Sequence, residues 1–152
     1  TRLSRGLGDV YKRQQYIQQV KKNASVLGEV LMANGIDIVT GGTDSHMVLV
    51  DLRSKNVTGK DAEESLERAG MTCNKNGVAN DPNPPTITSG IRLGSPAATT
   101  RGFKEDEFRF IGEKISTIIN TLSSSNSDIS MIESSIKKEV EDLCSKYPIY
   151  NH

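Results

Sequence analysis

The segment TSGIRLGSPAATT, from Thr88 to Thr100, carries one charged residue, Arg92, among glycines, serines and apolar residues. The nearest acidic residues along the chain are Asp81 before it and Glu105 after it. A guanidinium group is always charged, and burying it without a partner costs several kcal/mol. If this arginine faces the inside of the fold, we expect its partner to be a negatively charged group of a bound ligand.

The arginine lies in the last of the expected extended segments, Ile87–Leu93, and the small residues after Pro96 form a connection. Clusters of glycine, proline and asparagine separate the segments that come before it. In chain order these are the strand Ile36–Val39, the turn Gly41–Asp44, the strand His46–Leu52, the strand Met71–Asn74 and the loop Lys75–Pro85. We expect the first two strands to pair antiparallel.

Apolar residues recur every three or four positions elsewhere in the chain, which is typical of amphipathic helices. The first stripe ends at Asn34-Gly35. The second helix begins at the capping residue Thr58, has Asp61 three positions later and ends at Gly70. The stripes are Ile17, Val20, Ala24, Leu27 and Leu31; Ala62, Leu66 and Ala69; Phe108, Ile111, Ile115, Ile118 and Leu122; and Ile129, Ile132, Ile136, Val140 and Leu143.

The order of these elements is helix, strand, strand, helix, strand, strand, helix, helix. It predicts an α/β fold with a mainly antiparallel sheet and helices packed on it.

The composition is that of a globular domain and argues against several functions. The chain has 152 residues with 19 basic and 19 acidic side chains and no large basic cluster, so we expect neither nucleic acid nor a membrane as partner. No apolar run approaches the roughly 20 residues that span a bilayer, and no secretory signal is found, which predicts a cytoplasmic protein. We expect Cys73 and Cys144 to be reduced thiols, and His46 and His152 lack the spacing of a metal site.

The first segment, Thr1–Gln14, differs from the rest because it is rich in arginine and glycine and has no clear periodicity. Within it, Asp9–Gln14 look like the translation of an adapter used in sequencing libraries. We therefore expect residues 1–14 to be a non-native leader, and residues 15–152 to form one domain with a lead-in helix. The alternative is a natural flexible arm.

Two features are candidates for a binding site. Arg92 can hold a carboxylate through two parallel hydrogen bonds, and Gly90 and Gly94 let other groups approach the backbone. The alternative is a strand arginine that points to water. The loop with Asn74–Asn76 and Asn80–Pro82 offers amide donors and acceptors, unless these residues only stabilise turns.

Other polar residues fit a structural role. His46 has no recognisable nucleophile beside it, and Gly41-Gly42 lacks the spacing of a phosphate loop. The acids Glu63-Glu64 and Glu105–Glu107 are interpreted as solvated helix charges.

A series of short motifs follows a specific order and spacing along the chain: Gly41–His46, Leu49–Leu52, Thr58–Lys60, Asn74–Asn76, Asn80–Pro82, Thr88–Ala97, Arg101–Phe103 and Tyr147–Tyr150. Together they resemble the C-terminal part of the serine hydroxymethyltransferases, over about Gln15 to Tyr150. Each motif is short, and their shared order makes the resemblance specific.

The resemblance implies the small C-terminal domain of a fold-type I transferase that depends on pyridoxal phosphate. This family interconverts serine and glycine, and tetrahydrofolate takes the one-carbon unit. Arg92 matches the family arginine that holds the substrate carboxylate, and Asn76 matches the asparagine that contacts the pterin ring. The loop Asn74–Pro85 would form part of the folate pocket, with Ser89 and Gly90 in the wall beside the arginine.

The chain also departs from the family pattern. It lacks the Thr-Thr-His-Lys-Thr run with the Schiff-base lysine, and the histidine, aspartate and glutamate that act on the cofactor and substrate. We therefore expect a fragment without catalytic, cofactor-binding or metal-binding residues of its own, inactive alone. Its expected partners are serine, glycine, folate, the large domain of the same protein, and further copies in a homodimer or tetramer.

Two other functions remain open from the sequence. The chain could be the small domain of an aminotransferase-like enzyme, although such an enzyme has no use for a pterin contact at Asn74–Pro82. It could also be a stand-alone module in which Arg92 senses an amino acid.

Overall fold

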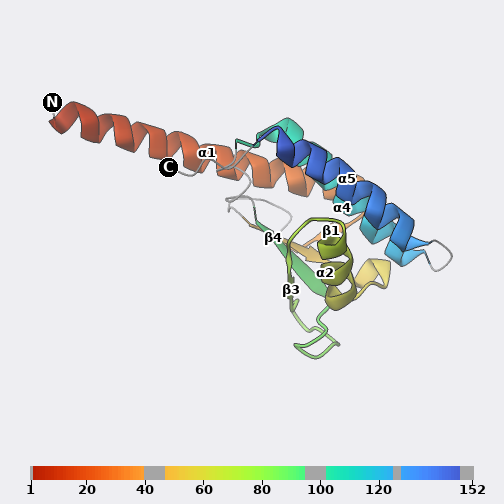
Figure 1. Cartoon of the computed structure of the whole chain (residues 1–152). Coiled ribbons are helices and arrows are strands. Elements are labelled where there is room, and N and C mark those ends of the chain that lie inside the picture. The colour runs from red at the N-terminus through yellow and green to blue at the C-terminus, as the bar shows by residue number, and fades with distance from the viewer. Residues whose placement is uncertain (1, 40–46, 95–101, 125–127, 148–152) are drawn as a thin grey trace.

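The computed structural model describes residues 2–39, 47–94, 102–124 and 128–147, and their side chains from Gly8 onward. The elements follow the expected order, with a short 3₁₀ helix added after the second strand (Figure 1). They are α1 (Arg2–Ala33), β1 (Asp37–Ile38), β2 (Met47–Asp51), η1 (Arg53–Lys55), α2 (Gly59–Arg68), β3 (Asn74–Asn76), β4 (Gly90–Gly94), α4 (Glu105–Ser123) and α5 (Ile129–Ser145). The predicted turn Gly41–Asp44 and His46 lie outside the described residues.

The four strands form one antiparallel sheet in the order β1-β2-β4-β3. The central strand β4 pairs with β2 on one side, where Leu49 lies opposite Arg92. On its other side β4 pairs with β3, where Asn74 lies opposite the same arginine. The predicted α/β class, the antiparallel sheet and the antiparallel pairing of the first two strands are therefore confirmed.

The boundaries of β3 and β4 differ most from the prediction, while the described ends of β1 and β2 differ from it by one residue. The third strand is not Met71–Asn74 but Asn74–Asn76, because that segment pairs with β4. The fourth strand begins at Gly90 rather than at Ile87. The reason is a turn before it, in which the carbonyl of Pro84 accepts hydrogen bonds from the amides of Ile87 and Thr88.

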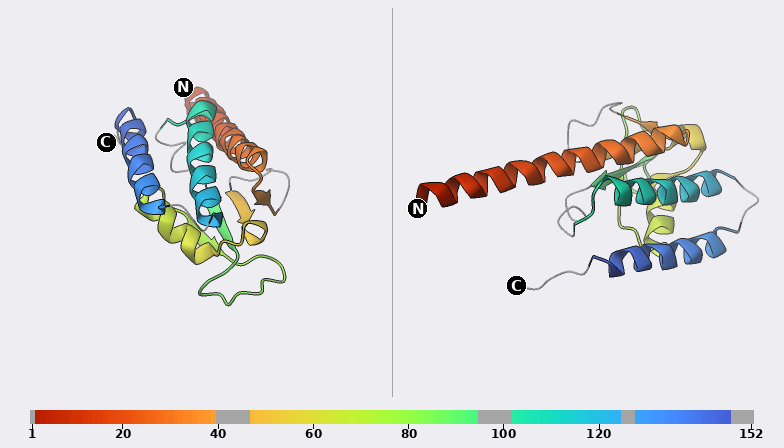
Figure 2. Two further views of the ribbon diagram at one scale, coloured as in Figure 1. Left: turned by 90° about the vertical axis from the view of Figure 1, so that its right-hand side faces the viewer. Right: turned by 90° about the horizontal axis from the view of Figure 1, so that it is seen from above.

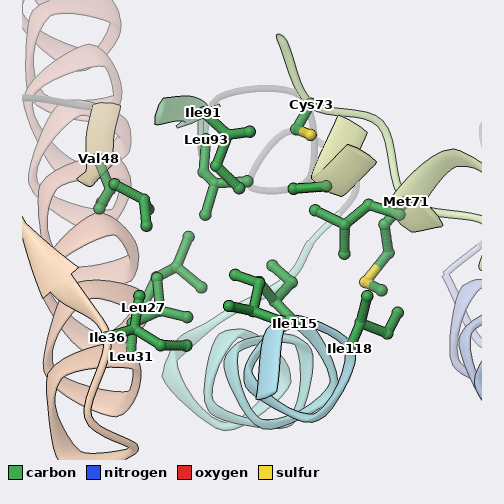
Figure 3. Close-up of a cluster of buried hydrophobic side chains, with 14 of the residues drawn as sticks. Leu27, Leu31, Ile36, Val48, Met71, Cys73, Ile91, Leu93, Ile115 and Ile118 are labelled. Atoms are coloured by element: carbon green, nitrogen blue, oxygen red, sulfur yellow. The ribbon is translucent and has the colours of Figure 1, made fainter. Parts of the chain in front are cut away.

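One face of the sheet is covered by helices and forms the core. Apolar side chains of β2 and β4 pack there against α1 and α4 (Figure 3). The helices α1 and α2 contact the sheet, α4 packs against both, and α5 packs against α4 and α2. Figure 2 shows α1, α4 and α5 lying side by side with α4 in the middle. The buried residues of the two strands are Val48, Val50, Ile91 and Leu93.

Several polar groups on the covered side have partners within the chain, although the side-chain oxygen of Asn120 on α4 is buried without a hydrogen-bond partner among the described residues. The Glu133 carboxylate on α5 is 4% exposed and accepts hydrogen bonds from the Ser65 hydroxyl, at 2.5 Å, and from the Arg68 guanidinium, both on α2. The Thr58 hydroxyl accepts from the amide of Asp61, so the predicted cap of α2 is confirmed. Such pairing is what burial requires of a polar group.

The first half of α1 extends beyond the rest of the domain (Figures 1 and 2). Ile17 was predicted to join the core, but it is 45% exposed. The helix reaches the core at Val20 and Asn23, where the Asn23 side chain donates to the carbonyl of Phe103 at 2.9 Å. The assignment of residues 1–14 as a non-native leader stays a prediction. No described helix is long and apolar enough to cross a membrane.

Candidate functional site on the open face of the sheet

The face of the sheet opposite the core carries Arg92. Its neighbours Ile91 and Leu93 are 0% and 5% exposed and point to the helices, so strand alternation points the arginine the other way. Arg92 is exposed and makes no ion pair with a described residue. Arg92 therefore does not face the core of the described fold, and no described residue supplies an acidic partner for it.

The asparagines of β3 lie on the same face. Asn74 is opposite Arg92 across the β3–β4 pair, and Asn76 is two residues further along β3. Residues that face each other across a sheet, and those two apart on a strand, share one side. Diagonal neighbours in a sheet lie about 7–8 Å apart. The structure thus brings the two predicted site residues, Arg92 and Asn76, to one face of adjacent strands.

The strand β3 lies at the edge of the sheet and is held from its outer side by α2. The Glu63 carboxylate accepts a hydrogen bond from the amide of Lys75 at 2.6 Å, and the Lys75 ammonium lies 3.8 Å from the same carboxylate. The interpretation of Glu63 as a solvated helix charge is therefore wrong. This contact fixes the backbone between Asn74 and Asn76, whose side-chain amide donates to the carbonyl of Gly77 at 3.0 Å.

Gly90 is required where β4 begins, because the neighbouring strands approach closely there. A Cβ atom at this position would lie 2.7 Å from the carbonyl oxygen of Val50 and 2.8 Å from that of Asn76. Both distances are shorter than any ordinary contact of a Cβ atom. The glycine therefore lets β3 and β2 close on β4 beside the arginine, and its role in a pocket wall stays a prediction.

The loop between β3 and β4 is organised by Asp81. Its carboxylate accepts hydrogen bonds from the amides of Val78, Asn83 and Ser89 and from the Ser89 hydroxyl. The Ser89 hydroxyl bond is the main reason that the pKa of Asp81 falls from its ordinary value of 3.8 to about 2. Ser89 was predicted to line a wall beside Arg92, but its hydroxyl is engaged by this loop and the residue is 2% exposed.

A second charged contact supports the same loop from the side of η1. The Arg53 guanidinium binds the Asp51 carboxylate at 2.6 Å and donates to the carbonyl of Ala79 at 3.3 Å. The hydrogen bond from Arg53 holds the pKa of Asp51 below its usual value. A groove of ≈ 360 Å³ lies between η1, the start of α2 and the loop, lined by Arg53, Asn56, Val57, Thr58, Pro82, Asn83 and Ser89.

The N-terminus of α2 does not serve as an anion site, because the chain itself satisfies its amides. The amides of Gly59 and Lys60 donate to the carbonyls of Thr88 and Ile87. A Cβ atom at Gly59 would lie 2.1 Å from the Thr88 hydroxyl oxygen, so the helix and the loop are in direct contact. This contact fixes the segment that leads into β4 and hence the position of Arg92.

The remaining candidates offer little chemistry. Among the described residues there is no group of three or more histidine, cysteine, aspartate or glutamate side chains that could hold a metal ion. Both cysteines were expected to be buried thiols; Cys73 is buried, whereas Cys144 is only partly buried. Burial raises the pKa of the Cys73 thiol to about 12, which disfavours a nucleophilic thiolate at neutral pH. The motif residues at 41–46 and 95–101 lie outside the described parts of the chain.

Pyridoxal phosphate does not fit the described residues on their own. The cofactor needs a lysine amine free to form a Schiff base and a carboxylate partner for its pyridine nitrogen. Within the described strands the only lysine is Lys75, and its ammonium faces Glu63 on the outer edge of the sheet. A substrate carboxylate, by contrast, fits the exposed guanidinium of Arg92.

The fold is a small antiparallel α/β domain in which helices cover one apolar face of the sheet. Within the described residues, the opposite face carries Arg92, Asn74 and Asn76 beside the apolar Met47 and Leu49. A family profile described as serine hydroxymethyltransferase matches residues 3–115. The chain therefore belongs to the serine hydroxymethyltransferase family, and the family resemblance predicted from the motifs is confirmed.

Individual relatives agree with the profile. The chain is 56% identical over 135 residues to a serine hydroxymethyltransferase of Paramagnetospirillum magneticum, and equally similar to one of Rhodospirillum centenum. A relative from Hyphomonas neptunium is 52% identical. In the first of these, the match covers 89% of this chain and 32% of the relative, so the chain spans about a third of that relative's length.

Proposed function

We propose that the chain forms the part of a serine hydroxymethyltransferase that holds the amino-acid carboxylate and one edge of the folate. The observation that carries this proposal is the placement of Arg92 and Asn76 on one open face of neighbouring strands. Family membership supplies the reaction class, in which serine and glycine are interconverted and tetrahydrofolate takes the one-carbon unit. The aminotransferase-like alternative has no comparable support.

Arg92 is proposed to bind the carboxylate of serine or glycine. Its planar guanidinium can donate two parallel hydrogen bonds, which fixes the orientation of the carboxylate as well as its position. Because the side chain is exposed and has no acidic partner among the described residues, it can accept a ligand without breaking an existing ion pair. Covering of the open face by the rest of the enzyme would then strengthen the interaction by excluding water.

Asn76 is proposed to contact the pterin ring of the folate. An amide carries both a donor and an acceptor, which suits the edge of a heterocycle that also presents both. The Glu63–Lys75 contact and the pairing with β4 hold the backbone at this residue, so the amide is presented from a fixed position. Asn74, the first residue of β3, is exposed on the same face and lies opposite Arg92.

Pyridoxal phosphate would act as the electron sink of the reaction when bound in the intact enzyme. The proposed role of the described residues is to hold and orient substrate groups. The one lysine of the described strands, Lys75, is engaged by Glu63, so the chain by itself is proposed to be inactive. We further propose that it is the small domain of a fold-type I enzyme, that it packs on a large domain in a homodimer or tetramer, and that the enzyme is cytoplasmic.

The test is Arg92→Lys in an intact enzyme that carries this sequence, with Arg109→Lys as a control on the outer surface of α4. An ammonium keeps the charge but cannot form the two parallel bonds, so we expect kcat/KM for serine to fall roughly ten- to hundredfold. The control should keep wild-type kinetics, because Arg109 contacts only Asp106 among the described residues. A kcat/KM for Arg92→Lys close to wild type would refute the assignment.

A further inference from the structure

We propose that Asp81 is a positioning residue that ties the two ends of the β3–β4 loop together and thereby sets the distance between the folate contact and the carboxylate contact. The expected effect on substrate binding rests on the proposed function. The fastening of the loop rests on the hydrogen bonds of Asp81 alone. Asp81 itself need not touch a ligand.

The two oxygens of Asp81 join segments on either side of the site. Oδ2 accepts from the amide of Val78 at 3.3 Å and from the amide of Ser89 at 2.8 Å. Val78 follows Asn76 by two residues, and Ser89 precedes Arg92 by three. A single oxygen atom therefore bridges the end of β3 to the start of β4.

Oδ1 closes the middle of the loop onto the same point. It accepts from the amide of Asn83 at 2.9 Å and from the Ser89 hydroxyl at 2.7 Å. The Asn83 side chain in turn donates to the Ser89 hydroxyl oxygen at 2.8 Å. The loop is thus fastened through one carboxylate rather than through a regular ladder of backbone bonds.

The chemistry of the four partners requires a carboxylate. All of them are donors, and an ionised carboxylate is an acceptor only, with room for about four hydrogen bonds. An asparagine of the same shape would turn an NH₂ group toward two of these donors. Because the Ser89 bond holds the pKa of Asp81 at about 2, the acceptor form is present throughout the neutral range.

The loop backbone also shows why such a fastening is needed. Asn80 and Thr88 have φ angles of 56° and 57°, in the left-handed region. For the β-branched Thr88 this conformation is unfavourable, and it persists only where surrounding contacts enforce it. Two contacts of that kind are the hydrogen bond that the Ser89 amide donates to the Asp81 carboxylate and the one that the Thr88 hydroxyl donates to the carbonyl of Gly90, at 3.0 Å.

The experiment compares Asp81→Asn with Asp61→Asn in an intact enzyme that carries this sequence. Asp61 is an exposed carboxylate in the first turn of α2, so its substitution removes the same charge without touching the loop. We expect Asp81→Asn to raise KM for serine and for tetrahydrofolate about tenfold each, and to speed hydrogen exchange in peptides that cover residues 76–92. A residue that only stabilised the fold would lower the active fraction, and hence the apparent kcat, while leaving both KM values unchanged.

Two further measurements keep the outcome decisive. If Asp81→Asn does not fold, Ser89→Ala should show a smaller rise of the same KM values, because it removes the 2.7 Å bond to Oδ1 and the bond from the Asn83 side chain but keeps the three amide bonds to the carboxylate. Unchanged KM values in the folded variant, together with a defective Arg92→Lys, would overturn the role of Asp81 and leave the proposed function standing. If Arg92→Lys also has wild-type kinetics, the proposed function fails. The hydrogen exchange of Asp81→Asn then decides whether Asp81 fastens the loop, and unchanged exchange in residues 76–92 would overturn that role.

Discussion

The two faces of the sheet differ in whether the described chain supplies contacts for their side chains. On the covered face, the apolar side chains of β2 and β4 pack against helices of the same chain, and a buried carboxylate such as Glu133 is paired with Ser65 and Arg68. On the open face, Arg92 stands beside two asparagines without an acidic partner among the described residues. One strand, β4, thus buries its odd-numbered residues Ile91 and Leu93 in the core and presents Arg92, the proposed carboxylate-binding residue, on the other face.

The largest expected effect lies on the covered face of β4. Ile91→Ala deletes a fully buried side chain, so we expect the free energy of unfolding of the chain to fall by about 2–5 kcal/mol. The neighbouring substitution Arg92→Ala should change the same quantity by no more than about 0.5 kcal/mol, because the side chain is exposed and forms no ion pair with a described residue. Urea unfolding of both variants measures the difference, and equal losses would contradict the division between the faces.

The next effect concerns the asparagine side of the open face. Asn76→Ala should raise KM for tetrahydrofolate about tenfold in the intact enzyme, as the loss of one or two hydrogen bonds implies. Aldol cleavage that needs no folate should change little. Thr86→Ala, at an exposed position of the same loop, is the matched control. Equal losses in the two reactions would mean that Asn76 does not serve folate alone.

The smallest effect is the pH dependence of the loop. Folding lowers the pKa of Asp81 from 3.8 to about 2. The stabilisation that the ionised carboxylate contributes is therefore fully present above pH 3.8 and is lost as the pH falls toward 2. The melting temperature of the wild-type chain should therefore fall more steeply between pH 4 and pH 2 than the melting temperature of Asp81→Asn. Parallel melting curves for the two proteins in this window would show that the carboxylate is not held as described.

Periodicity in the sequence was enough to predict the order of the elements and the cap at Thr58. The alternation Ile91-Arg92-Leu93 also contains the information that the arginine faces away from the core, although the lack of a nearby acid left both an inward and a water-facing orientation open. Ile17 was misassigned because a helical stripe does not reveal where the rest of the domain ends.

The hydrogen bonds that hold the candidate site in place could not be predicted from the spacing of residues in the sequence. The bond from Ser89 to Asp81 joins residues eight positions apart, and the bond from Lys75 to Glu63 joins residues twelve positions apart. Both depend on how the β3–β4 loop and α2 pack in three dimensions. Asn80–Pro82 was noted as a candidate, but turn chemistry and loop fastening use the same residue types, so the sequence did not separate them.

The most direct test of the proposed division is a crystal structure of an intact enzyme that carries this sequence, with glycine and a folate bound. The account predicts that both terminal nitrogens or one terminal nitrogen and Nε of Arg92 lie within about 3.2 Å of the two glycine carboxylate oxygens, with the pterin ring beside Asn76 on the same face. A glycine carboxylate held by other residues, with Arg92 still pointing into water, would contradict it.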